Sequence, residues 1–87
     1  MIRMNDLEYL GKMRGRHTWA YGGDYYYWTE RANIVTTDSI GVTPFCPVVL
    51  KLQHGKPNTI QPLTRTDAKR AIVAKLNATY IEGAVNG

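Results

Sequence analysis

The sequence predicts an α+β fold, in which a small antiparallel sheet of three to four strands packs against one C-terminal helix, with a short N-terminal helix in front. Three stretches of the chain support this prediction. Residues 19–28 hold six of the nine aromatic residues, arranged around Gly22-Gly23. That pair is typical of a hairpin turn, because glycine reaches positive φ without steric cost. Residues 48–53 alternate like a half-buried strand, and residues 65–82 carry a helical apolar pattern.

The first element expected is the short helix, over about residues 5–10. Asn5 can cap its first N–H groups, and Gly11 can end it in the left-handed conformation. An extended segment then leads into the aromatic stretch. If residues 12–16 are extended, the period of two of a strand puts Lys12, Arg14 and Arg16 on one face.

The aromatic stretch is expected to form a hairpin over about residues 17–35. In its second strand, Tyr25 and Tyr27 alternate with Tyr26 and Trp28. Rings on both faces are unusual for a sheet with one face in water, so one face is expected to present aromatic side chains to a partner. The alternative is that the tyrosine rings pack in the core and leave their hydroxyls in water.

The segment after the hairpin is expected to be an edge strand or a loop, because Pro44 and Pro47 cannot donate to a central ladder. Cys46, between Phe45 and Pro47, is expected to be a small buried residue and not a nucleophile. The strand at about residues 48–53 follows, then a turn and a short return strand.

The main helix is expected over about residues 65–82. Thr64 as N-cap with Asp67 three residues later resembles a capping box, and Leu63 can pack on Ala68 as a hydrophobic staple. Gly83 is expected to end the helix. One side of the helix is apolar and is expected to pack on the strand of residues 48–53; it gathers Ile72, Val73, Leu76 and Tyr80.

Length and composition indicate one domain over residues 1–87. The chain is 44% hydrophobic and 21% charged, as in globular proteins. No run approaches the ~18 apolar residues that a membrane span needs, and the N-terminus has no apolar signal-peptide core. One cysteine excludes an intrachain disulfide and fits a reducing compartment. We therefore expect a cytoplasmic protein that does not enter a membrane.

The net charge of +4 is unevenly distributed along the chain. Residues 17–50 carry one cation against three carboxylates, whereas the segments before and after them are basic. Such asymmetry predicts an acidic partner, either a protein surface or a nucleic acid. The alternative is that the charge serves solubility, because +4 is ordinary for a small domain.

The sequence contains no motif of a known catalytic or cofactor site. It has no phosphate-binding glycine loop, no dinucleotide fingerprint, no CxxC and no HExxH. With His17 and His54 far apart and one cysteine, a metal site of three or four ligands is not expected. We therefore expect no cofactor, no metal and no catalytic residue. A concave pocket that joins either histidine to Asp24, Glu30 or Asp38, with a strongly perturbed pKa, would point instead to an enzyme.

The function predicted is a non-enzymatic protein–protein interaction domain that docks an aromatic surface with basic flanks onto an acidic protein. Small inhibitors or adaptors of phages and mobile elements share this size and composition. One alternative is binding of single-stranded nucleic acid, with cations along its backbone and rings under its bases. A second is a small structural subunit, for which self-association into a homo-oligomer stays open. The partner-binding residues expected are Trp19, Tyr21, Tyr25, Tyr27, Trp28, Lys12, Arg14, Arg16 and Arg31.

Overall fold

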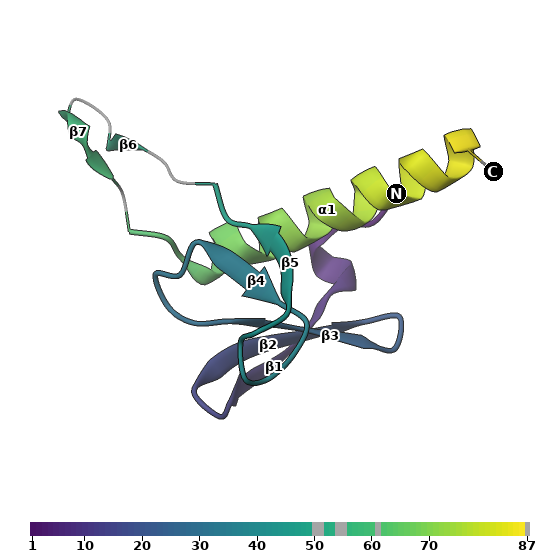
Figure 1. The fold of residues 1–87 in the computed structure, drawn as a ribbon, viewed down its shortest axis with the longest axis horizontal. Helices are drawn as coiled ribbons and strands as arrows, with labels where there is room; N and C mark the ends of the chain where they lie inside the picture. Colours follow the sequence, from purple (N-terminus) through teal and green to yellow (C-terminus); the bar gives the residue numbers. More distant parts are fainter. Residues whose placement is uncertain (50–51, 54–55, 61, 87) are drawn as a thin grey trace.

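The computed structural model describes residues 1–49, 52–53, 56–60 and 62–86. Five strands form one antiparallel sheet in chain order, and helix α1 lies along one side of it (Figure 1). Two further strands pair with each other apart from that sheet. The elements are a 3-10 turn η1 (Met4–Asp6), β1 (Glu8–Met13), β2 (Arg16–Tyr21), β3 (Asp24–Trp28), β4 (Ile34–Thr36), β5 (Pro44–Pro47), β6 (Leu52–Gln53), β7 (Lys56–Ile60) and α1 (Arg65–Asn86).

The α+β class and the C-terminal helix are confirmed, but the sheet has five strands and not three to four. The additional strand at its start is β1, which takes residues 8–10 of the segment expected to be a helix over residues 5–10. That expectation is wrong, because only Met4–Asp6 forms a helical turn. Strand pairing with β2 overrides the local helix signals, since a helix of two turns has little stability alone.

Both tight hairpins of the sheet are closed by two residues with positive φ. Tyr21 pairs with Asp24, and the loop between them is Gly22-Gly23, with φ of 59° and 86°. Met13 pairs with Arg16, and the loop is Arg14-Gly15, with φ of 55° and 79°. Positive φ at both positions is the signature of the type I′ turn, whose twist matches that of paired strands. The predicted Gly-Gly hairpin is confirmed.

Strand register divides the sheet into two faces. Directly paired residues point to the same side, so the pairs His17–Trp28 and Trp19–Tyr26 share one face. We call it the inner face, because its rings lie in the core with Ala68 and Ile72 of α1. The outer face carries the alternate residues, and its pairs are Thr18–Tyr27, Ala20–Tyr25 and Met13–Arg16.

The core consists of large rings from the sheet and small or aliphatic side chains from β4, β5 and α1. Trp28 is 1% exposed, and its indole Nε1 donates to the carbonyl of Ala32 at 2.8 Å. Burial, together with the nearby charge of Asp24, raises the pKa of Tyr26. The buried hydrophobic residues are Leu7, Trp19, Tyr26, Trp28, Val35, Cys46, Val48, Leu63, Ala68 and Ile72.

Helix α1 starts as the capping sequence predicts. The backbone N–H and the hydroxyl of Thr64 both donate to Oδ2 of Asp67, at 2.8 and 3.0 Å, and the N–H of Asp67 bonds back to Thr64 Oγ1. The helix contacts β3, β4, β5 and η1. Asn77 holds the N-terminal segment through two bonds with the backbone of Ile2, at 2.8 and 3.1 Å.

The remaining predicted boundaries need correction. The second strand of the hairpin ends at Trp28 instead of continuing to about residue 35, because a turn closed by the Ala32 N–H and the Thr29 carbonyl separates β3 from β4. The strand expected at residues 48–53 does not form as one unit: β5 ends at Pro47, β6 begins at Leu52, and residues 50–51 lie outside the described part. Helix α1 passes Gly83 and ends at Asn86.

Candidate interaction surface

The structure divides the predicted partner-binding residues between the two faces. Trp19 and Trp28 are 2% and 1% exposed on the inner face, and Tyr21 is half-buried against the same core. The prediction that the two tryptophans present an exposed aromatic surface is therefore wrong. Their large apolar rings are covered from one side by α1, which supplies the second layer that the sheet needs.

Tyr25, Tyr27 and Arg16 lie on the outer face, away from α1, with Arg16 at the end of the β1–β2 turn and Tyr25 at the opposite end, next to the Gly22-Gly23 turn. Tyr25 is 49% exposed, whereas Tyr27 is half-buried beside the fully buried Thr18. Met13, which pairs with Arg16, is 47% exposed. The face thus combines exposed ring and thioether surface with a guanidinium, a combination common in protein interfaces.

Arg16 connects the sheet to the loop between β4 and β5. Its guanidinium donates to Thr29 Oγ1 at 2.7 Å and to the carbonyl of Ile40 at 3.3 Å. The guanidinium also lies so close to Gly41 that a Cβ added there would be 2.8 Å from Nη2. Arg16 is therefore held in place, with the exposed side chain of Ile40 next to it.

Asp38 organises the same loop. Its carboxylate accepts hydrogen bonds from the N–H groups of Val42 and Thr43 at 2.8 to 3.1 Å. Desolvation acts to raise the pKa of Asp38, but these backbone bonds outweigh it, and with the charge of Arg16 they hold that pKa below its ordinary value. The ordered loop presents Ile40 and Val42 as exposed apolar side chains.

The two exposed arginines of the predicted set occupy the left-handed region of the backbone. Arg14 has φ of 55° in the β1–β2 turn, and Arg31 has φ of 66° in the turn after β3. Among the described residues they are the only ones other than glycine with positive φ, and neither forms an ion pair there. Such conformations cost about 1–2 kcal/mol for a residue with a Cβ and often occur at functional sites.

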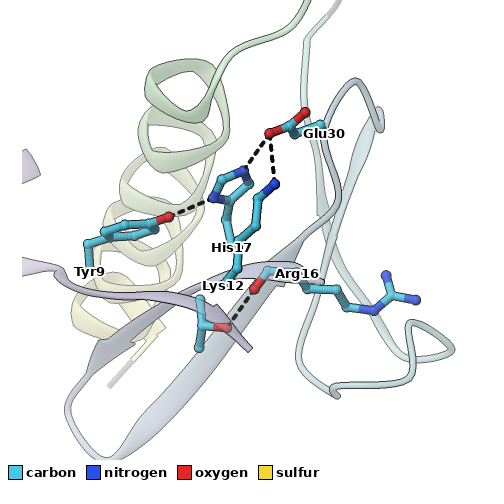
Figure 2. A network of polar contacts seen from close by, with 6 residues as sticks. Tyr9, Lys12, Arg16, His17 and Glu30 are labelled. Atoms are coloured by element: carbon cyan, nitrogen blue, oxygen red, sulfur yellow. Dashed lines mark hydrogen bonds and ion pairs between the residues drawn. The ribbon is translucent and has the colours of Figure 1, made fainter. Parts of the chain in front are cut away.

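Lys12 does not share a face with Arg16, so the predicted stripe of three cations is wrong. The turn at Arg14-Gly15 reverses the chain, and Lys12 pairs with His17 on the inner side. There its ammonium lies 3.2 Å from Glu30 Oε1 (Figure 2). The strand register nevertheless brings Lys12, Arg14 and Arg16 to the same end of the sheet, with the turn that contains Arg31.

A chain of polar contacts runs along the inner edge of this end and was not predicted from the sequence. Figure 2 shows the Tyr9 hydroxyl bonded to His17 Nδ1, at 2.7 Å, and His17 Nε2 directed at Glu30 Oε1, at 3.3 Å. A carboxylate can only accept, so the hydrogen of a neutral His17 belongs on Nε2 and Tyr9 donates to Nδ1. The hydrogen bond from Lys12, and next that from His17, lower the pKa of Glu30.

The structure thus brings His17 next to Glu30, an arrangement that the sequence analysis linked to an enzyme. His17 is 5% exposed, stacked on Trp28 with 5.6 Å between ring centroids, and both of its nitrogens are engaged. Its nitrogens therefore serve the hydrogen bonds that join β1, β2 and the turn after β3. In the described part of the chain, no group of three or more His, Cys, Asp or Glu residues is placed to hold a metal ion.

Cationic and acidic side chains gather at opposite ends of the sheet. The end with the β1–β2 turn carries the cations described above, with Glu30 near Lys12 and Asp38 near Arg16 as carboxylates. The opposite end, at Gly22-Gly23, carries Asp6, Glu8 and Asp24 around two hollows of 350 and 470 Å³. An acidic partner would therefore be attracted to the end with the β1–β2 turn.

Comparison of the chain with models of protein families, with curated protein sequences and with solved structures finds no match in any of the three. Within the described residues, no helix has the length and apolar character needed to cross a membrane.

Proposed function

We propose that the protein is a non-enzymatic interaction module that docks its outer face onto an acidic surface of another protein. The observation that supports this best is the register of β1, β2 and β3, which puts Tyr25, Tyr27 and Arg16 on one face, in that order along its length. Tyrosine and arginine are enriched at the energetic centres of protein interfaces. Arg14 and Arg31 stand at the end of this face and supply the charge that steers an acidic partner.

A protein partner fits the exposed side chains better than single-stranded nucleic acid does. Nucleic-acid platforms need exposed rings on which successive bases stack, and both tryptophans are buried in the core. The side chains exposed around Arg16 are aliphatic or thioether groups, namely Met13, Ile40 and Val42. Binding of single-stranded nucleic acid remains the second candidate, and a structural subunit that binds its own copies is the third.

The size of the chain and its basic charge suit a small inhibitor or adaptor of the phage or mobile-element type, acting in the cytoplasm. A protein of this kind works by covering a surface of a larger partner. It needs no cofactor or metal, and we propose none here.

The test is affinity capture from a lysate, with and without nuclease, followed by mass spectrometry. The bait set is the wild type, Tyr25→Ala, Arg14→Glu and Lys75→Ala. Lys75 is an exposed cation on α1, away from the outer face, and serves as the control. We expect one acidic protein to survive nuclease, to be retained by Lys75→Ala and to be lost with the other two variants.

Two results would contradict the proposal. Loss of all captured material after nuclease, with binding that falls steeply and log-linearly with salt, would assign the function to nucleic-acid binding. Equal capture by all four baits would mean that the outer face is not the interface. Circular dichroism of each variant distinguishes loss of binding from loss of fold.

A further inference from the structure

A second candidate site lies on the opposite side of the molecule, where the first turns of α1 meet β1 and β2. It is a cavity of about 210 Å³ lined by Tyr9, Trp19, Arg65, Thr66 and Lys69. It is open to solvent, and its volume is several times what a single water molecule needs. It can therefore receive a small ligand or one chemical group of a larger one.

The cation nearest to the ring wall is held in a defined position. The guanidinium carbon of Arg65 lies 4.8 Å from the centroid of the Tyr9 ring, within the range of a cation–π contact. The ring itself is fixed from behind, because its hydroxyl is bonded to the buried His17. The polar contacts that link His17 to Glu30, and Glu30 to Lys12, therefore hold the Tyr9 ring in its position in the cavity wall (Figure 2).

The charges of the cavity are of one sign. Arg65 and Lys69 contribute two cations and Thr66 a hydroxyl, while no carboxylate lines the cavity. Within the described residues, neither Arg65 nor Lys69 forms an ion pair. Two unpaired cations and a hydroxyl donor together supply the charge and the hydrogen bonds that bind a dianion. A guanidinium binds phosphate oxygens through two parallel hydrogen bonds.

We propose that this cavity binds the phosphoryl dianion of a small phosphate monoester, with Arg65 and Lys69 on the oxygens and the part-exposed ring of Tyr9 against the organic part. The site lies on the inner side, against α1, whereas Tyr25 and Arg16 lie on the outer face. It is independent of the proposed docking surface, and either one can fail without the other.

The experiment is a titration of the ¹⁵N-labelled full-length protein with phenyl phosphate, inorganic phosphate and phenyl sulfate, followed by NMR at constant ionic strength. Phenyl phosphate is expected to shift the amide signals of Tyr9, Trp19 and residues 65–69, and to bind more tightly than the other two. Arg65→Ala and Lys69→Ala should each weaken binding by about tenfold or more, the range typical of a lost hydrogen bond to a charged group. Arg65→Lys keeps the positive charge but loses the two parallel N–H donors of the guanidinium. Its affinity should therefore lie between those of the wild type and Arg65→Ala.

Lys75→Ala is the matched control, because it removes an exposed cation from the same helix outside the cavity. Its affinity should stay within about twofold of the wild type, since isolated surface charges contribute little. Equal weakening in Lys75→Ala, or signal shifts at Arg14 and Arg31 instead of residues 65–69, would show diffuse charge attraction and overturn the site. Shifts that do not saturate would overturn it as well. The spectra of the unliganded variants verify that each is folded.

Discussion

The hydroxyl of Tyr9 bonds Nδ1 of His17 at 2.7 Å, although the two residues are not paired across their strands. Tyr9 pairs with Trp19 and Gly11 with Thr18, so Leu10 is an extra residue that forms a β-bulge. Gly11, with φ of 88°, provides the backbone freedom that the bulge needs. A bulge bends its strand and redirects side chains. Here it brings the Tyr9 ring over the edge of the core and toward the start of α1.

Replacement of Trp28 by alanine should destabilise the fold by about 3–5 kcal/mol, the usual cost of deleting a buried aromatic ring. The change also leaves the carbonyl of Ala32 without its indole donor. Urea denaturation followed by circular dichroism measures the loss. Tyr25→Ala is the comparison, because that ring is exposed on the outer face and its removal should cost less than about 1 kcal/mol. Similar losses for both variants would contradict the assignment of the two faces.

Glu30 should make a pH-dependent contribution to stability. Its hydrogen bonds to Lys12 and then His17 lower its pKa from 4.5 in the folded state. The folded protein therefore gains stability from the ionised carboxylate above about pH 4.5 and loses it as the pH falls through the lower folded value. The difference in unfolding free energy between wild type and Glu30→Gln should be present at pH 7 and shrink below pH 4.5. A difference that grows toward acid pH would contradict the contacts of Figure 2.

Cys46 should react slowly with thiol reagents as long as the protein is folded. Burial raises the pKa of its thiol from 9.0 to about 11, against a smaller opposing effect of Lys75. At pH 8 about one thiol in a thousand is then ionised, compared with about one in ten at the ordinary value, and only the thiolate reacts. Reaction with a chromogenic disulfide at pH 8 should therefore accelerate by about a hundredfold or more in urea. Equal rates with and without urea would place the thiol at the surface.

The parts of the fold predicted correctly are those determined by short-range chemistry. Gly22-Gly23 predicted its hairpin, and Thr64 with Asp67 predicted the start of α1, because each signal acts within four residues. The prolines at 44 and 47 correctly placed β5 at an edge of the sheet. Local signals failed for residues 8–10, where pairing with β2 determines the structure. The Arg14-Gly15 pair could have revealed that hairpin, but arginine is not a usual first residue of a type I′ turn.

The candidate site was harder to predict for the same reason. Alternation in β3 correctly separated Tyr25 and Tyr27 from Tyr26 and Trp28, yet it could not tell which set α1 covers. The contact of Tyr9 with His17 and Arg65 depends on a bulge and on a helix more than fifty residues away in the chain. No spacing in the sequence carries that information.

Gly41→Ala should be more destabilising than Gly15→Ala. Both glycines have φ near 80°, so alanine at either position should lower the free energy of unfolding by the same backbone term, about 1–2 kcal/mol. A Cβ at Gly15 has no atom within 4 Å, whereas at Gly41 it lies 2.8 Å from the Arg16 guanidinium. Displacing that group weakens its bonds to Thr29 and Ile40, for an additional cost of about 1 kcal/mol. Denaturant midpoints measure the difference, which should disappear in an Arg16→Ala background; if it persists there, the extra cost does not come from Arg16.

Arg14→Asn should stabilise the fold while it weakens partner binding. The change creates an Asn-Gly loop, the preferred sequence of a type I′ turn, and relieves an arginine held at φ of 55°. Relief of about 1 kcal/mol would raise the melting temperature by about 4–8 °C in a chain of this size. The same change removes an exposed cation from the end of the outer face, so affinity for the acidic protein should fall by up to about fivefold. Arg14→Lys is the control: it keeps the charge, should bind like the wild type and should gain no stability. Stabilisation by Arg14→Asn without any loss of binding would show that the arginine in this turn does not serve the interface.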